Sequence, residues 1–281
     1  MPALLEVRDL VVRYEPPVGP PVLAVDGLDL EIHEREAVGV VGESGSGKTT
    51  VLLATLGLLP PDARVVRGSV RWQGRDLLAM GERQRREVRG AEVSVVFQDP
   101  ALALNPFRRV GPQIAEVIAA HERCSAAERR ARTLQALHEV HLADPSAVHD
   151  AYPHELSGGQ RQRIAIAQAL VCRPALLLAD EPTASLDTVT QAEIRALLVD
   201  LRRRTGLSVL LVSHELRSVA ALADRVVVLH AGRAVEAGPA AQVFGAPVHP
   251  YTRALLAASP RALIADPTVP WVAAAGGAHG A

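Results

Sequence analysis

The chain has 281 residues, of which 30 are basic and 31 are acidic, so its formal net charge is −1. This balance gives no global positive field, and we expect no nucleic-acid partner. No apolar run reaches the roughly 18 residues needed to span a bilayer. The two cysteines are not clustered, which is typical of a reducing compartment and offers no metal framework. The length is sufficient for one large α/β domain with a helical insertion, or for two lobes.

The N-terminal zone, to about residue 73, predicts short strands around a proline-rich hairpin. The strands are expected at residues 5–12, 28–32 and 70–73, and the hairpin at residues 16–21. A further apolar stretch at residues 37–41 predicts a buried strand.

The segment GESGSGKT at residues 42–49 fits the pattern G-x-x-x-x-G-K-[ST], with a helix expected after it at residues 49–59. Glycines let successive N–H groups point at phosphates, and the helix dipole adds positive charge. Lys48 would reach the β- and γ-phosphates, and the Thr49 hydroxyl would ligate Mg²⁺. The alternative is a glycine-rich turn before a buried helix, but the flanking strand and helix favour phosphate binding. The candidate nucleotide-binding residues here are Gly42, Glu43, Ser44, Gly45, Ser46, Gly47, Lys48, Thr49 and Thr50.

The middle of the chain, from about residue 74 to 153, is mostly helical in pattern after a short strand at residues 93–97. Apolar residues recur at helical spacing, first at Ile114, Val117 and Ile118 and then at Leu134, Leu137 and Val140.

The run ALLLADE at residues 175–181 is apolar up to its two carboxylates, which predicts a strand buried on both faces. Open α/β sheets bind ligands at the carboxyl ends of their strands. Asp180 is therefore the candidate metal carboxylate, and Glu181 the residue that polarises an attacking water. The alternative, a solvated turn before Pro182, is weakened by the phosphate loop upstream. A helix at residues 190–203 and strands at 208–212 and 225–229 are expected next.

The segment LSGGQRQR at residues 156–163 narrows the class, because here the chain resembles the ATP-binding subunits of ATP-binding-cassette (ABC) transporters. LSGGQ resembles the signature motif of that family, and its polar and glycine residues would open a helix at about residues 160–171. Alone, it could be only the N-cap of an amphipathic helix. The motif contributes Ser157, Gly158, Gly159 and Gln160 as candidate nucleotide-binding residues.

Four further residues match motifs of that family. Tyr14 resembles the aromatic residue that stacks on adenine, although a tyrosine at a strand end can also be plain packing. Gln98 resembles the Q-loop glutamine, which approaches Mg²⁺ and the attacking water. Asp187 lies in a segment resembling the D-loop, in which Ser185 replaces the usual alanine. His214 resembles the switch histidine that contacts the γ-phosphate.

The resemblance covers about residues 3–258 and implies a P-loop NTPase fold of the α/β class. It would be a single ABC nucleotide-binding domain with a mostly parallel core sheet, an N-terminal antiparallel β-subdomain, and a helical subdomain at about residues 100–172. Glu181, His214 and Gln98 would be catalytic, and Thr49, Gln98 and Asp180 would hold Mg²⁺. Residues 259–281 are expected to form a poorly ordered tail.

The family mechanism implies ATP hydrolysis by two such subunits that close head to tail. Ser157 and Gly159 of one subunit would then touch the γ-phosphate held by Lys48 of the other. The chain has no internal repeat, so the second cassette, identical or not, comes from another chain. Transmembrane permease subunits and, indirectly, an extracytoplasmic solute-binding protein are implied, with the ATPase peripheral on the cytoplasmic face of the cell membrane.

Two segments indicate a subfamily: FQDPALALNP at residues 97–106 and HPYTRALL at residues 249–256 resemble the dipeptide, oligopeptide and nickel importers. Many peptide-importer subunits carry a cysteine cluster after the second segment, but residues 260–281 contain no cysteine. Peptide is therefore only slightly favoured over nickel. The alternative function is a soluble ABC ATPase in a non-transport complex. Ribosome-type members usually have two cassettes per chain and DNA-type members have long coiled coils, and this chain has neither.

Overall fold

The computed structural model describes residues 3–258, so the tail expected at residues 259–281 lies outside the described residues. Contacts divide the chain into two compact units. The first unit comprises residues up to Met80 together with those from Ser208 onward, and the second unit comprises Gly81–Leu207. Within the described residues, no helix combines the length and the apolar character that crossing a bilayer requires.

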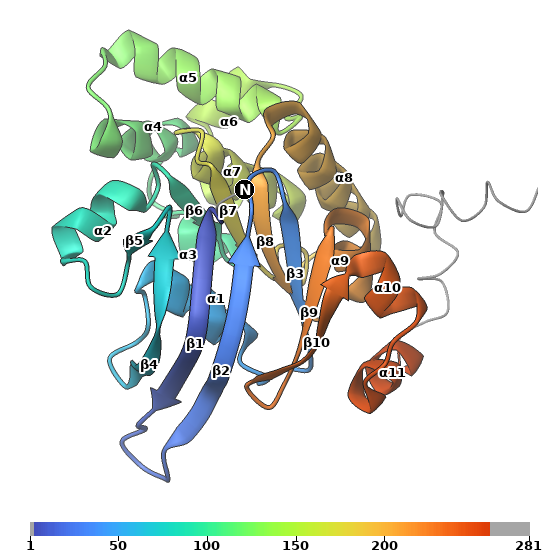
Figure 1. The fold of residues 1–281 in the computed structure, drawn as a ribbon. Helices are drawn as coiled ribbons and strands as arrows, with labels where there is room; N and C mark the ends of the chain where they lie inside the picture. The colour runs from blue at the N-terminus through green and yellow to red at the C-terminus, as the bar shows by residue number, and fades with distance from the viewer. Residues whose placement is uncertain (1–2, 259–281) are drawn as a thin grey trace, which may run out of the picture. The chain divides into compact units, whose positions relative to one another are not determined.

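An antiparallel sheet in the first unit has the strand order β2-β1-β4-β5 (Figure 1). Val7, Leu10 and Leu28 are among the buried residues of this sheet. Its strands are longer than the sequence predicts, because ladder pairing with β1 extends over exposed residues that carry no apolar signal. The bounds are β1 (Leu5–Tyr14), β2 (Val22–Ile32), β4 (Ala63–Trp72) and β5 (Arg75–Asp76).

A second group of strands in the same unit is mostly parallel. The central strand β3 (Ala37–Val41) pairs in parallel with β8 (Ser208–Ser213) and with β9 (Arg225–His230), and β10 (Arg233–Pro239) pairs antiparallel with β9. All residues of β3 and β8 are buried, as continuous apolar runs predict. The helices among the described residues of this unit are α1 (Lys48–Leu56), α9 (Leu216–Leu222), α10 (Ala240–Gly245) and α11 (Pro250–Ala257).

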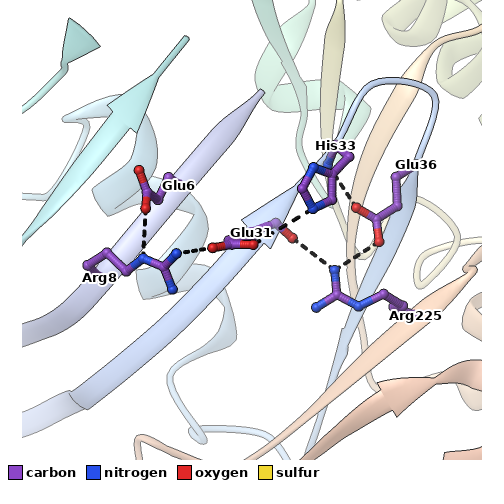
Figure 2. Close-up of polar contacts among 6 residues, drawn as sticks. All are labelled: Glu6, Arg8, Glu31, His33, Glu36 and Arg225. Atoms are coloured by element: carbon purple, nitrogen blue, oxygen red, sulfur yellow. Dashed lines mark hydrogen bonds and ion pairs between the residues drawn. The ribbon is translucent and has the colours of Figure 1, made fainter. Parts of the chain in front are cut away.

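A polar network joins the antiparallel sheet to the start of β9 (Figure 2). The Arg225 guanidinium donates to Glu36 Oε1 over 2.9 Å, and Glu36 Oε2 accepts from the backbone N–H of His33 over 2.8 Å. The His33 ring lies 3.7 Å from Glu31 on β2, and Glu31 also pairs with Arg8 on β1. Three strands of the first unit therefore share one chain of polar contacts.

The second unit combines the parallel pair β6 (Val93–Val96) and β7 (Leu176–Asp180) with a group of helices. Helices α4, α5 and α6 pack on one another, and α7 contacts both α4 and α5 (Figure 1). Their core includes Ile114, Ile118, Leu137 and Ile164, all fully buried. The helices are α2 (Glu82–Val88), α3 (Pro100–Ala103), α4 (Val110–His121), α5 (Ala126–Glu139), α6 (Pro145–Asp150), α7 (Gly158–Leu170) and α8 (Thr188–Thr205), with a 3₁₀ turn at Pro153–Glu155.

The expected combination of an antiparallel N-terminal sheet, mostly parallel strands and a helical region is confirmed.

Candidate functional site

Residues 42–47 form a tight loop between β3 and α1, and close backbone approaches require glycine at Gly42 and Gly47. A Cβ on Gly42 would lie 2.1 Å from the carbonyl oxygen of Leu229, and a Cβ on Gly47 would lie 2.2 Å from that of Ala24. Gly47 also has a φ of 103°, which L side chains rarely adopt. The loop is thus held between β2 and β9, and its crest is exposed at Glu43, Ser44 and Gly45.

Lys48 begins α1 with a buried side chain. Its ammonium donates to the carbonyl oxygens of Gly42, over 2.9 Å, and Glu43, over 2.8 Å. A cation is thereby fixed across the loop beside the N-terminal end of a helix, where anions bind favourably. Thr49 is exposed at the next position, which leaves this residue accessible to a ligand. The side chain of Ser46 is buried, and the described structure gives its hydroxyl no hydrogen-bond partner.

Tyr14 and His214 are the other predicted site residues of the first unit. Tyr14 is the last residue of β1, and its hydroxyl lies 3.3 Å from the hydroxyl of Thr50 on α1. The strand end is therefore next to the helix that follows the phosphate loop. His214 is exposed directly after β8, the strand that pairs with β3. Tyr14 thus lies on a strand that contacts α1, and His214 directly follows a strand that pairs with β3.

Asp180 ends the buried strand β7 of the second unit, and Glu181 directly follows it. The exposed fractions of the two residues are only 5% and 8%. Glu181 has a φ of 48°, in the left-handed region that residues other than glycine seldom occupy. Such conformations cost on the order of 1–3 kcal/mol and cluster at functional sites. The acidic pair is therefore buried, whereas the sequence alone left a solvated turn open as the alternative.

The signature segment begins α7, with Ser157 as its N-cap. The Ser157 hydroxyl accepts a hydrogen bond from the N–H of Gln160 over 3.2 Å, and Gln160 Oε1 accepts from the N–H of Ser157 over 2.9 Å. This reciprocal capping box fixes the first turn. Ser157 is therefore an N-cap, as the alternative interpretation of LSGGQ requires. The cap places Gly158 and Gly159 at the start of the helix.

Gly159 packs against the first turn of α8, where Asp187 is the N-cap. A Cβ on Gly159 would lie 2.6 Å from Cγ2 of Thr190. The Asp187 carboxylate accepts from the Thr190 hydroxyl over 2.6 Å and from the N–H groups of Thr190 and Val189. The hydrogen bond from the Thr190 hydroxyl, followed by the one from its backbone, lowers the pKa of Asp187. Asp187 therefore remains anionic while it caps the helix next to the signature glycines.

Gln98 follows β6 and is exposed. Its backbone carbonyl lies 3.5 Å from the hydroxyl of Ser185, the residue that stands where the D-loop pattern usually has alanine. A residue predicted to be catalytic thus lies next to the segment that resembles the D-loop, in the second unit.

The motif of the phosphate loop does not predict one contact that the loop makes with a distant segment. Tyr251, in the first turn of α11, accepts a hydrogen bond through its hydroxyl from the backbone N–H of Glu43 over 3.0 Å. The only available signal was the segment HPYT, which contains Tyr251 but says nothing of where the helix packs.

Comparison with known proteins gives two family matches. Residues 25–184 match the family model described as ABC transporter. Residues 235–272 match the model of the oligopeptide/dipeptide transporter C-terminal region.

Individual proteins agree with these matches. The chain is 46% identical over 260 residues to the probable peptide ABC transporter ATP-binding protein y4tR of Sinorhizobium fredii, covering 92% of this chain and 77% of the relative. It is 44% identical over 258 residues to the dipeptide transport ATP-binding protein DppD of Escherichia coli, covering 92% and 79%. Among solved structures, the dimeric post-hydrolysis state of the ATP-binding cassette MJ0796 bound to ADP and Pi superposes with a TM-score of 0.74 at 28% identity, covering 84% of this chain and 98% of that one.

Proposed function

The chain belongs to the ABC transporter family and is an ATPase of that family, and from this premise we propose that it drives the import of di- or oligopeptides. The observation that carries the proposal is identity of 44–46% over 92% of the chain to relatives named for peptide transport. The match of residues 235–272 to the oligopeptide/dipeptide transporter C-terminal region points the same way. The relatives named above favour a peptide as the transported solute. The sequence alone favoured peptide over nickel only slightly.

The nucleotide phosphates bind, on this proposal, to the loop from Gly42 to Thr50. Its backbone amides and the Lys48 ammonium hold the anion, and Tyr14 contacts the adenine. The fixed shape of the loop supports this role, because Gly42 and Gly47 admit no side chain. Lys48 is already aligned across the loop by two carbonyl groups and loses little freedom when it binds phosphate.

The residues proposed to hold Mg²⁺ are Thr49, Gln98 and Asp180, which present hydroxyl, amide and carboxylate oxygens. This donor set suits a hard divalent cation, and bound Mg²⁺ would neutralise charge on the phosphates. Glu181 orients the attacking water and accepts its proton, and His214 contacts the γ-phosphate. The buried, conformationally constrained position of Glu181 supports a fixed catalytic base.

The partner cassette, we propose, supplies a second copy of the signature segment. Ser157, Gly158, Gly159 and Gln160 of one subunit would bind the γ-phosphate held by the other, with Asp187 beside them at the start of α8. Exposure of Ser157 and the absence of side chains on the two glycines leave the helix start accessible to an anion. The similarity to a dimeric cassette bound to ADP and Pi supports this arrangement.

Permease subunits in the membrane are the proposed mechanical partners, and they would hold the chain at the cytoplasmic face of the membrane. The loop between α3 and α4 offers a docking residue, because the Phe107 side chain is exposed (88%) while hydrogen bonds hold the loop that carries it. The Gln113 amide donates to the carbonyls of Asn105 and Arg108, and its oxygen accepts from the N–H of Asn105. An extracytoplasmic solute-binding protein would select the peptide.

The experiment that tests the ATPase assignment compares ATP binding and hydrolysis in Glu181→Gln and Lys48→Ala. We expect Glu181→Gln to bind ATP with near-normal affinity, to lose at least about a hundredfold in turnover, and to accumulate as an ATP-bound dimer in size-exclusion chromatography. Lys48→Ala should weaken ATP binding itself.

The matched control is Glu139→Gln, which removes a half-buried carboxylate at the end of α5. It should hydrolyse ATP like the unmodified chain. Steady-state turnover in Glu181→Gln equal to that of Glu139→Gln would overturn the assignment of Glu181.

The transport proposal is tested in a host that lacks the chain. Restoration of labelled dipeptide uptake by the unmodified chain, but not by Glu181→Gln, is the expected result. Recovery of the chain without any membrane subunit would instead favour the alternative, an ABC ATPase in a non-transport complex.

A further inference from the structure

Helix α11 reaches the phosphate loop directly. The hydroxyl of Tyr251 accepts a hydrogen bond of 3.0 Å from the backbone N–H of Glu43, although the two residues are 208 positions apart. Glu43 is the first residue after Gly42, at the point where β3 leads into the loop. The contact therefore lies at the entrance of the loop, and it comes from a segment outside the ATP-binding motifs.

The entrance of the loop is also held by Lys48. The Lys48 ammonium donates to the carbonyl of Glu43 over 2.8 Å and to that of Gly42 over 2.9 Å. Glu43 is thus fixed by its N–H to α11 and by its carbonyl to the lysine proposed to bind the phosphates. Movement of Glu43 would change the position of the ammonium.

Tyr251 is itself held on two sides. Its ring lies 3.9 Å, centroid to centroid, from the ring of His230, the last residue of β9. Its N–H donates to Nδ1 of His249, the N-cap of α11. His230 directly follows Leu229, whose carbonyl oxygen blocks any side chain at Gly42. The hydroxyl therefore approaches Glu43 from a defined direction.

Glu236 on β10 anchors the start of α11. Its carboxylate accepts from the N–H groups of Val248 and His249, over 2.9 Å each. Burial raises the pKa of Glu236, but the contact with Thr252 and the two backbone hydrogen bonds outweigh this effect and leave the pKa lowered. The carboxylate thus stays charged at neutral pH and keeps the helix start in place.

We propose that Tyr251 is a positioning residue for ATP binding, which holds the phosphate loop in its binding conformation through Glu43 and makes nucleotide affinity depend on docked α11. The inference rests on the proposed role of the loop. A loop whose shape is fixed before binding loses less conformational entropy when it binds phosphate. Loss of one neutral hydrogen bond should therefore weaken nucleotide binding by about two- to tenfold.

The test is the variant Tyr251→Phe in the full chain, which removes the hydroxyl and keeps the ring against His230. We expect the Kd for MgATP and for MgADP to rise together by about two- to tenfold, with kcat at saturating ATP near that of the unmodified chain. A hydroxyl that served only stability would lower the thermal unfolding midpoint and leave the Kd unchanged. That result would overturn the proposal.

Two matched variants sharpen the test. Tyr152→Phe removes a hydroxyl in the second unit, where the ring contacts His154 and Arg109, and its nucleotide affinity should equal that of the unmodified chain. Glu236→Gln loosens the start of α11 and should also raise the Kd, but should add little to Tyr251→Phe, because both act on the same contact. Full additivity of the two would show that α11 does not act through Tyr251.

Lys48→Ala, measured in parallel, distinguishes failure of the loop's role from failure of the role of Tyr251. Unchanged affinity in Lys48→Ala would overturn the proposed role of the loop itself. Lost affinity in Lys48→Ala with normal affinity in Tyr251→Phe would overturn only the role of Tyr251.

Discussion

Gly47 shows how a single residue fixes the shape of the phosphate loop. Its φ of 103° is strained for any L side chain, and a Cβ would meet the backbone carbonyl of Ala24 at 2.2 Å. A flexible side chain could move away from such a contact, but a carbonyl group within β2 cannot move without disturbing the strand. Glycine is therefore required at this position for two separate reasons, the positive φ angle and the lack of space for a Cβ.

The substitution Gly47→Ala should lower the free energy of unfolding by more than the cost of its φ angle alone. The matched control is Gly19→Ala, because Gly19 has a φ of 110° and a Cβ added there would meet no atom within 4 Å. The control should cost roughly 1–2 kcal/mol, and Gly47→Ala about 1–3 kcal/mol more. Denaturant unfolding measures both. Equal losses would show that the contact with Ala24 relaxes freely.

At the scale of elements, the start of α7 is fitted to the start of α8. Gly159 leaves no room for a methyl group because Cγ2 of Thr190 occupies the space, and Thr190 is held by the Asp187 carboxylate. A Cβ added to Gly158 would lie 3.5 Å from Cδ2 of Leu186, which is an ordinary van der Waals distance. Two adjacent glycines of one motif thus face different surroundings.

Alanine should therefore have opposite effects at the two positions. Gly158→Ala should stabilise the protein by about 0.5–1 kcal/mol, because alanine favours a helix. Gly159→Ala should destabilise it by about 1–3 kcal/mol. The double variant Gly159→Ala with Thr190→Ser should recover most of the loss, since serine lacks Cγ2 but retains the hydroxyl for Asp187. Denaturant unfolding without nucleotide measures the three variants, and absence of rescue would contradict the steric explanation.

The elements also show what the sequence could and could not predict. The strand expected at residues 37–41 is β3, because an uninterrupted apolar run carries its own signal. The helix expected to reach residue 59 ends at Leu56, where Gly57 adopts a φ of 61° and its N–H bonds to Ala54. Strand β4 begins at Ala63 and not near residue 70, since its first residues are mostly exposed and are defined by pairing with β1.

The candidate site likewise contains some features that the sequence predicts and others that it does not. The phosphate loop and the acidic end of β7 were predicted because their chemistry is written in consecutive residues. The contact of Tyr251 with Glu43 and the fit of Gly159 to Thr190 were not, because each depends on how distant segments pack. The elements β10 and α10, which carry weak periodicity, were likewise not predicted.

At the scale of the whole molecule, Phe107 is the exposed apolar side chain that the proposed permease contact best explains. The Asn105 side chain accepts from the N–H of Phe107 over 2.9 Å, which holds the residue outward on a firm turn. Burial of this side chain against a partner would remove apolar surface from water, which favours association.

The substitution Phe107→Ser should reduce co-purification of the chain with membrane subunits by about tenfold or more, as for a buried aromatic anchor, while ATP affinity of the purified chain stays unchanged. Val18→Ser is the control, because Val18 is equally exposed (90%) on the hairpin between β1 and β2. Affinity purification from native membranes measures both. Equal recovery of membrane subunits with the two variants would exclude Phe107 from the contact.

The pairing of β3 has a consequence for how the chain is made. The two strands that pair with β3 are β8 and β9, and both lie beyond residue 207. The whole second unit, one continuous stretch of chain, therefore separates β3 from its partners in the sequence. At roughly 5–20 residues per second, a ribosome needs on the order of ten seconds to pass from one part of the first unit to the other. Through that interval β3 has left the ribosome with both edges unpaired. Synthesis of the second unit therefore sets a waiting time during which an apolar strand must be kept from joining other chains.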